Sequence, residues 1–161
     1  MTEAPNFSTD LTGQTALVTG TTSGLGRRFA EVLAACGANV AIAGRRVDRL
    51  EELADRLRNA GGNVLTVPLD VTDTDALFTS VARVQDELGP IQILVNNAGK
   101  PDAKLALRMD PKFVDEMVAT NLTSLFHLAS EVTRRLIEAE LPGRIVNIAS
   151  GAAYSAGIGT S

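Results

Sequence analysis

The sequence predicts an α/β domain built on a doubly wound parallel sheet of five strands, in the spatial order 3-2-1-4-5, with helices on both faces. Short, β-branched apolar runs alternate with longer segments of helical period, which is typical of parallel βαβ units. Each run is almost continuously apolar, as in strands that are covered on both faces. With 161 residues, 45% of them apolar, the chain can form one domain with its own core.

The elements follow in order along the chain. Strands are predicted at 15–19, 39–43, 63–67, 91–95 and 144–148. Three helices are predicted at 24–35, at 47–60 and from about Asp73 to the residue before Gly89, and a glycine follows each of them. The fourth and longest helix has Asp110 as its N-cap and Pro111 at its first position. A polar arm at 1–10 precedes a single predicted domain at 11–161.

Composition excludes several classes of function. The net charge of −4 argues against a nucleic-acid groove or an anionic membrane surface, because both need an excess of basic residues. The single cysteine, Cys36, cannot form an internal disulfide, and His127 has no second ligand at metal-binding spacing, so we predict no metal site. The first ten residues resemble no targeting signal, and no apolar run could span a bilayer. We therefore expect a soluble, cytoplasmic protein.

A glycine-rich turn follows the first strand directly and leads into the first helix. Gly20 would permit the tight turn, Gly24 would let the backbone approach a pyrophosphate, and Gly26 would let the helix pack on the sheet. The alternative is an ordinary glycine-rich βα turn, but strand, turn and helix occur in the right order for a phosphate site. The predicted binding residues here are Gly20, Thr22, Ser23, Gly24, Leu25 and Gly26.

The Gly-x-x-x-Gly-x-Gly spacing resembles that of the short-chain dehydrogenase/reductase family. Further motifs occur in family order over residues 11–161, and the nearest relatives in appearance are sugar-acid or ketoacyl-type reductases. The resemblance implies a Rossmann fold and hydride transfer between a nicotinamide and a small alcohol or ketone substrate. It implies cofactor contacts at Asp70, Val71, Asn97, Ala98 and Gly99, and catalytic roles for Asn121 and Ser150.

Cofactor preference depends on the end of the second strand, where NAD enzymes place an acidic residue for the ribose hydroxyls. Gly44 occupies that position, and Arg45 and Arg46 follow it. Their charge suits a 2′-phosphate, so we expect NADP, with NAD possible, and Arg45 is the better candidate because it is nearer the strand end. The alternative is that both arginines only begin a solvated helix. Asp70 has an alternative role too, as a cap of the turn that precedes the next helix.

The catalytic set is incomplete in this chain. Ser150 would hydrogen-bond the substrate oxygen, and Asn121 would break the long helix locally so that its carbonyl binds water, the alternative being an ordinary polar residue on the helix surface. The family's Tyr-x-x-x-Lys element is absent, because Tyr154 lies too close to Ser150 and Ile158 stands where the lysine would be. We therefore expect an N-terminal portion of a reductase, truncated before that element and inactive alone.

Two further expectations follow from this truncation. Without the later strands and helices, the fifth strand becomes an exposed apolar edge and the fourth helix lacks a neighbour, which favours association into a homo-oligomer. The alternative function is a non-catalytic NADP(H)-binding or partner-binding protein, since the Tyr and Lys are missing. Ser150 and Asn121 favour the enzyme, because a pure binder needs neither.

Overall fold

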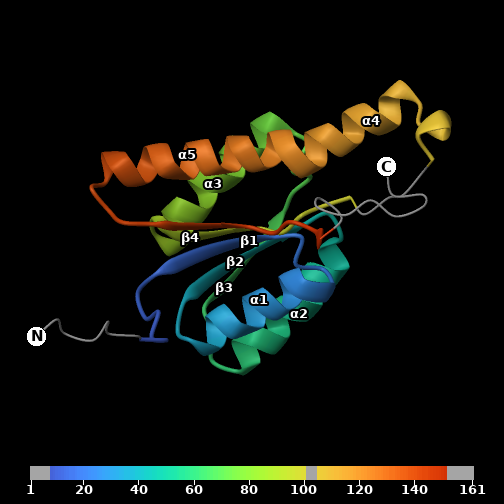
Figure 1. Ribbon diagram of the computed structural model, residues 1–161. Coiled ribbons are helices and arrows are strands. Elements are labelled where there is room, and N and C mark those ends of the chain that lie inside the picture. Colours follow the sequence, from blue (N-terminus) through green and yellow to red (C-terminus); the bar gives the residue numbers. More distant parts are fainter. Residues whose placement is uncertain (1–7, 101–104, 152–161) are drawn as a thin grey trace, which may run out of the picture.

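A computed structural model describes residues 8–100 and 105–151 (Figure 1). Its centre is a parallel sheet in the order β3-β2-β1-β4-β5, which confirms the predicted fold class and strand order. The strands are β1 (Thr15–Thr19), β2 (Asn39–Gly44), β3 (Val64–Pro68), β4 (Ile91–Asn96) and β5 (Arg144–Asn147). Every boundary lies within one residue of the prediction.

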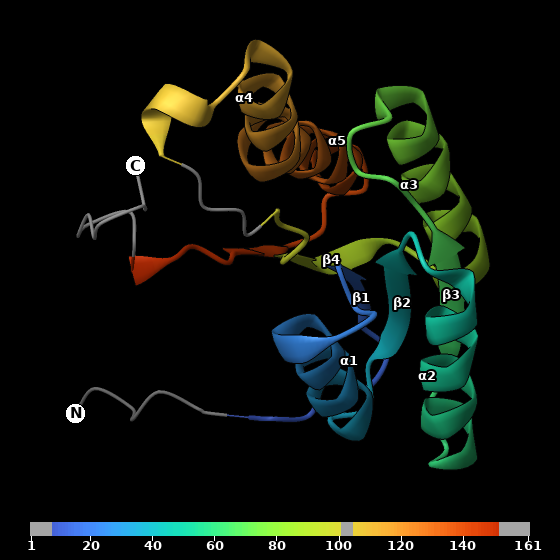
Figure 2. The ribbon, with the colours of Figure 1, turned by 90° about the vertical axis from the view of Figure 1, so that its right-hand side faces the viewer.

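Helices cover both faces of the sheet, as Figures 1 and 2 show. Helices α1 (Gly24–Ala35) and α2 (Val47–Asn59) pack on one face, and α3 (Thr74–Leu88) and α5 (Ser124–Glu138) pack on the other. Successive residues of a strand point to opposite faces, so Leu17 packs with α3 and α5 while its neighbours Ala16 and Val18 pack with α1 and α2. The central strands are therefore apolar along their whole length.

Side chains and glycines set the helix ends much as the sequence predicts. The carboxylate of Asp73 accepts the N–H of Ala76 at 3.0 Å and caps α3, and that of Asp110 accepts the N–H of Phe113 at 2.8 Å and caps α4 (Pro111–Val118). Glycines with positive φ follow the first three helices, at Gly37, Gly61 and Gly89.

The predicted fourth helix is one long rod with a wide turn inside it. Helix α4 runs into a π-helical segment, η2 (Ala119–Thr123), which continues directly into α5. The local break expected at Asn121 is thus a π turn rather than an interruption. Such turns insert one extra residue and often mark functional sites. The short 3-10 helix η1 (Ala106–Arg108) had no sequence prediction.

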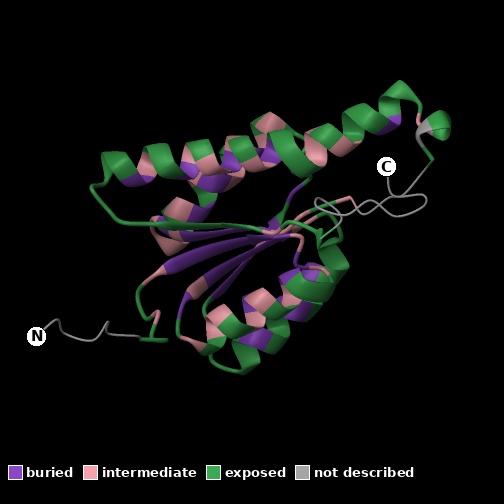
Figure 3. Cartoon of the chain, in the orientation of Figure 1, coloured by how far each residue is buried: buried purple, intermediate pink, exposed green. Residues whose placement is uncertain are grey.

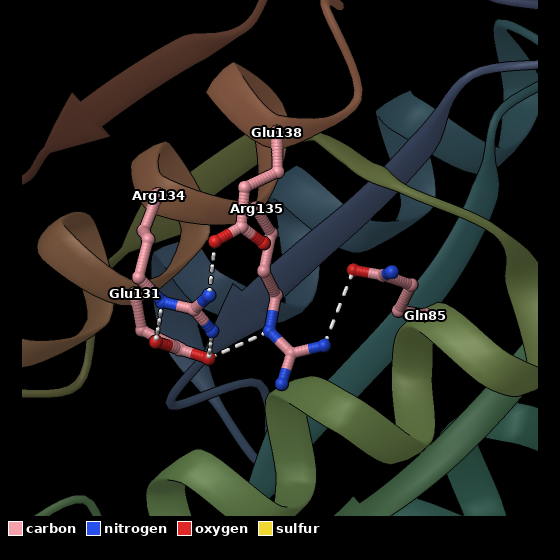
Figure 4. Close-up of polar contacts among 5 residues, drawn as sticks. All are labelled: Gln85, Glu131, Arg134, Arg135 and Glu138. Carbon is pink, nitrogen blue, oxygen red and sulfur yellow. Dashed lines mark hydrogen bonds and ion pairs between the residues drawn. The ribbon is translucent and has the colours of Figure 1, made fainter.

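A charged network ties the end of α5 to α3 (Figure 4). Glu131 accepts hydrogen bonds from Arg134 at 2.7 Å and Arg135 at 2.6 Å, and Arg135 reaches Gln85 of α3 at 3.4 Å. The bond from Arg134 is the main reason that the pKa of Glu131 is lowered, against an opposing effect of burial. Glu131 is thereby held ionised, and it orders the two arginines that fix this end of the rod.

Strand β5 is the open side of the sheet. Among the described residues it pairs only with β4, and all four of its residues are exposed, whereas the other strands are largely buried (Figure 3). Asn96 of β4 donates to the Oδ1 atom of Asn147 at 2.8 Å, which fixes the register of β5 and of the segment that leads to Ser150. No helix in the described part of the chain is long and apolar enough to cross a membrane.

Candidate functional site

The glycine turn is joined to β4 through Thr19 and Asn97. The Thr19 hydroxyl oxygen accepts the backbone N–H groups of Asn97 and Ala98, each at 3.0 Å. In return, the Asn97 side-chain amide donates to the carbonyls of Thr19 at 3.0 Å and Gly20 at 3.2 Å. These bonds join the carboxyl ends of β1 and β4. The turns that follow the two strands are therefore held next to each other.

Glycine is required at two positions of this turn for different reasons. Gly20 has φ +71°, and a Cβ there would lie 2.9 Å from the Cα of Ala98. Gly26 lies in the first turn of α1, and a Cβ there would overlap the Gly20 carbonyl and the Asn97 amide. Gly24 differs, because its Cβ would meet no heavy atom within 4 Å. The helix can therefore approach the strand ends closely while space remains open beside Gly24.

A cavity of about 840 Å³ extends along the carboxyl ends of β1 to β4. The glycine turn lies at its middle, the ends of β2 and β3 form one side, and the loop after β4 with helix α4 forms the other. The N-cap residue of α1, Ser23, makes no capping bond with its side chain, so the first N–H groups of that helix remain available to a ligand. Ligands bind in this position in doubly wound sheets.

The β2 side of the cavity is positively charged. Arg46 donates to the Thr22 hydroxyl at 2.6 Å and to the Ser23 hydroxyl at 3.3 Å, which places its guanidinium beside the glycine turn. Arg45 instead lies 3.7 Å from the Oδ2 atom of Asp70. Two guanidinium groups therefore border the same end of the cavity. Each is paired with a polar side chain that an anionic ligand could replace.

Asp70 closes the turn after β3, which is the alternative role considered for it, and also pairs with Arg45. Its Oδ1 atom accepts the N–H of Thr72 at 3.0 Å and the Thr72 hydroxyl at 2.8 Å, which closes the turn, while its Oδ2 atom faces Arg45. Burial acts to raise the pKa of Asp70, but the bonds from Thr72 and the charge of Arg45 together lower it. An ionised acceptor thus lies at the end of β3.

The opposite end of the cavity is formed by Lys100 and α4. The Lys100 ammonium lies 2.6 Å from the Oε2 atom of Glu116 and 5.1 Å from the ring centre of Phe113. Asn121, in the π turn, accepts the backbone N–H of Lys100 at 2.8 Å and donates to its carbonyl at 3.4 Å. The Asn121 side chain therefore holds the loop after β4.

Most of the predicted cofactor residues line one cavity, although their separation in the sequence is large. Those lining it are Gly20, Thr22, Ser23, Arg45, Arg46, Asp70, Val71, Asn97, Ala98 and Gly99. Gly24, Leu25, Gly26, Asn121 and Ser150 do not line it, and Leu25 is 60% exposed. Ser150 follows β5 and is exposed, and Tyr154 and Ile158 lie outside the described residues.

Sequence reasoning missed several lining residues on the β4 side, notably Lys100 and Glu116. Two signals could have found them. Lys100 directly follows Gly99 at the end of a parallel strand, and Asp115 with Ala119, like Glu116 with Thr120, are four residues apart and so share a helix face.

The donor set fits an elongated anionic ligand with a phosphate group near its middle. Helix N–H groups and hydroxyls lie at the glycine turn, guanidinium groups lie at one end, and small residues after β4 leave the backbone accessible at the other. This chemistry and volume match a nicotinamide dinucleotide, as the sequence predicts. In the part of the chain that the structure describes, no group of three or more His, Cys, Asp or Glu residues could hold a metal ion.

Alanine substitutions at Gly26 and Gly24 distinguish a closely packed position of the turn from an open one. We expect Gly26→Ala to lower the free energy of unfolding by about 1–3 kcal/mol, because its methyl group would overlap the Gly20 carbonyl and the Asn97 amide. Gly24→Ala meets open space and adds only the cost of φ +58°, about 1 kcal/mol. Urea unfolding measures both variants. An equal or smaller loss for Gly26→Ala would contradict the close packing described above.

Comparison with known proteins agrees with this geometry. A family model described as short chain dehydrogenase matches residues 14–161. Over 140 residues the chain is 36% identical to gluconate 5-dehydrogenase from Gluconobacter oxydans (strain 621H), covering 87% of this chain and 54% of that protein. It is also 36% identical over 138 residues to 3-oxoacyl-[acyl-carrier-protein] reductase from Escherichia coli (strain K12), covering 86% and 55% of the two chains.

Solved structures give the same result. A putative gluconate dehydrogenase from Agrobacterium tumefaciens superposes with a TM-score of 0.87 at 37% identity, covering 92% of this chain and 58% of that one. A variant of actinorhodin polyketide ketoreductase with NADPH gives a TM-score of 0.86 at 33% identity, covering 91% and 57%. The chain thus spans little more than half the length of these relatives. Its sequence, its strand order and its matched motifs together place the chain in the short-chain dehydrogenase/reductase family.

Proposed function

We propose that the chain forms the cofactor-binding part of an NADP(H)-dependent oxidoreductase that acts on the hydroxyl or carbonyl group of a small molecule. The observation that supports this most is the single cavity over the strand ends, with the glycine turn at its middle and two arginines at one end. The names of the relatives, a gluconate dehydrogenase and an oxoacyl reductase, are consistent with this reaction class.

Each part of the cavity would have a separate task in binding. The first N–H groups of α1, with the Thr22 and Ser23 hydroxyls, would hold the pyrophosphate. Asp70 would accept a hydrogen bond from the adenine amino group, and the backbone at Ala98 and Gly99 would lie against the second ribose. Bound there, a nicotinamide dinucleotide donates or accepts hydride.

Two residues would serve the substrate. Ser150 would donate a hydrogen bond to the reacting oxygen, and the π turn at Asn121 would leave a backbone carbonyl able to hold a water molecule. Neither supplies the proton that the substrate oxygen needs after hydride arrives. We assign that step to a Tyr-Lys pair that residues 1–161 lack, and we propose that they form an N-terminal portion of the enzyme, with the cofactor domain at 11–161. The alternative is a protein that binds NADP(H) or a partner without catalysis.

An activity assay distinguishes the two functions. We expect the chain to bind NADPH but to reduce aldehydes and ketones about 10²–10⁴-fold more slowly than a fusion in which the C-terminal segment of Gluconobacter oxydans gluconate 5-dehydrogenase follows Gly151, because a positioned general acid contributes about this factor. NADPH oxidation is followed optically. Ser150→Ala in the fusion should remove most of the gain.

Two results would contradict this proposal. A folded fusion that binds NADPH and reduces no substrate would favour the non-catalytic protein. Turnover by the chain alone that matches the fusion, and that is lost in Tyr154→Phe, would assign the proton transfer to Tyr154.

The preference for NADP rests on the residues that follow β2. Gly44 carries no carboxylate to bind ribose hydroxyls, and Arg45 and Arg46 border the cavity together with the Thr22 hydroxyl. A 2′-phosphate between them would receive charge-assisted hydrogen bonds from both guanidinium groups. Arg46 is already directed to the glycine turn, whereas Arg45 must leave Asp70.

Reversing one charge tests this preference. Arg45→Asp should weaken NADPH binding by roughly 10-fold or more and leave NADH binding nearly unchanged, since a charged hydrogen bond contributes about 1.5–3 kcal/mol. Calorimetric titration measures both affinities. Arg49→Asp is the matched control, because Arg49 lies on α2 away from the cavity and pairs with Asp48 and Glu52. Equal losses for both cofactors in Arg45→Asp would refute NADP selectivity.

We propose a cytoplasmic homo-oligomer that binds small molecules and no nucleic acid, with its contact on the outer face of the α4–α5 rod. Exposed apolar side chains recur there four residues apart, at Val114, Val118, Leu122 and Phe126. The row is self-complementary under a two-fold axis, as symmetric dimers require. At 1.5 Å per residue it is long enough, about 20 Å, to contact the same row of a second copy.

Sedimentation velocity tests this contact. Phe126→Glu should convert the assembly to monomers, because a carboxylate would be buried between two apolar rows. Val32→Glu is the control, since Val32 is an exposed apolar residue of α1 outside the row. Monomers in the unsubstituted chain, or an unchanged assembly in Phe126→Glu, would reject this face as the contact.

A further inference from the structure

Lys100 lines the cavity, and its side chain is paired with α4. Its ammonium meets the Glu116 carboxylate at 2.6 Å and lies 5.1 Å from the centre of the Phe113 ring. Phe113 is 5% exposed, so the ring is a fixed surface, while the Lys100 and Glu116 side chains are 32% and 47% exposed. The pair is accessible to solvent at the edge of the cavity.

The main chain of the same residue is held independently. Asn121 pairs with both the N–H and the carbonyl of Lys100, as a neighbouring strand would. Lys100 is thus fixed at its backbone by the π turn and at its side chain by α4. Both attachments come from the same rod, so Lys100 and α4 together form one wall of the cavity.

This wall borders the end of the cavity that lies away from the arginines. The strand order puts the ends of β2 and β3 on one side of the glycine turn and the end of β4 on the other. A dinucleotide with its pyrophosphate at the turn and its adenosine beside Arg45 must therefore place its other half along Gly99, Lys100 and α4.

We propose that Lys100 and Glu116 are positioning residues for the non-adenine half of the dinucleotide. This inference rests on the proposed function. A lysine has a long flexible stem, and when unpaired it would sample the space that the ligand needs. Held against Phe113 by Glu116, the side chain leaves that space open, while Asn121 separately holds the Lys100 backbone. The pair acts by preorganisation, which lowers the entropic cost of binding.

Another role for Lys100 predicts the opposite response. If its ammonium bound the ligand directly, Glu116 would compete with that ligand, and removing the carboxylate would tighten binding. If Glu116 positions Lys100, removing either partner weakens binding. The sign of the effect at Glu116 therefore separates positioning from direct contact.

The test compares a whole dinucleotide with its adenine half. The affinities of NADPH and of adenosine 2′,5′-bisphosphate are measured by calorimetric titration for the unsubstituted chain, Lys100→Met and Glu116→Gln. We expect both variants to bind NADPH about three- to five-fold more weakly, which is the range for an accessible ion pair. Both should bind the bisphosphate unchanged, because that ligand does not reach α4. Lys100→Arg, which keeps the charge, should restore most of the NADPH affinity.

Matched controls exclude a general loss of stability. Glu87→Gln breaks the exposed Arg83–Glu87 pair of α3, which lies outside the cavity, and should change neither affinity. Tighter NADPH binding in Glu116→Gln, equal weakening of both ligands, or no change in either variant would overturn the positioning role while leaving the binding site itself intact. If the unsubstituted chain bound neither ligand, the proposed function would fail and this inference with it.

Discussion

The junction between Thr19 and Asn97 is the constraint on which the rest of the site depends. Its four hydrogen bonds join the ends of β1 and β4. The atoms of this junction limit the space that is left for side chains in the glycine turn. Gly20 and Gly26 have no space for a side chain because Asn97, Ala98 and the Gly20 carbonyl fill it. Helix α1 can therefore begin close to the strand ends, and the side chain of its N-cap residue Ser23 does not occupy its first N–H groups. The hydrogen bonds between these two strands thus help to form the cavity along the carboxyl ends of the sheet.

The two ends of this edge are built differently. On the β2 side, flexible arginines have exchangeable partners, Asp70 for Arg45 and two hydroxyls for Arg46. On the β4 side, Lys100 is held at both main chain and side chain. The first arrangement suits recognition of a charged group, because a ligand can replace weak contacts with stronger ones. The second suits a surface that must keep its shape while chemistry takes place beside it.

Much of the fold could be predicted because local and tertiary signals agree. The buried strands are apolar throughout, glycines follow the first three helices, and Asp110 caps a helix as expected. The strand ends then identified most residues of the cavity. The spacing of Glu116 and Thr120 places them on one helix face, but it does not show that this face borders the cavity, because that depends on where α4 packs. The different polar partners of Arg45 and Arg46 could not be predicted either, because they depend on the direction in which each side chain points. Val64 rather than Asn63 begins β3, a one-residue difference of the kind that strand ends allow.

Amide NMR spectra recorded during titration with NADPH test the central claim, that one dinucleotide lies along the carboxyl ends of β1 to β4. The account predicts shifts at residues 22–26, at Arg45 and Arg46, at Asp70 to Thr72 and at Ala98 to Lys100, all saturating at the same concentration. Residues at the opposite ends of the strands, such as Asn39 and Ile91, should stay unchanged. Shifts confined to another surface, or none at saturating NADPH in the folded chain, would contradict the account.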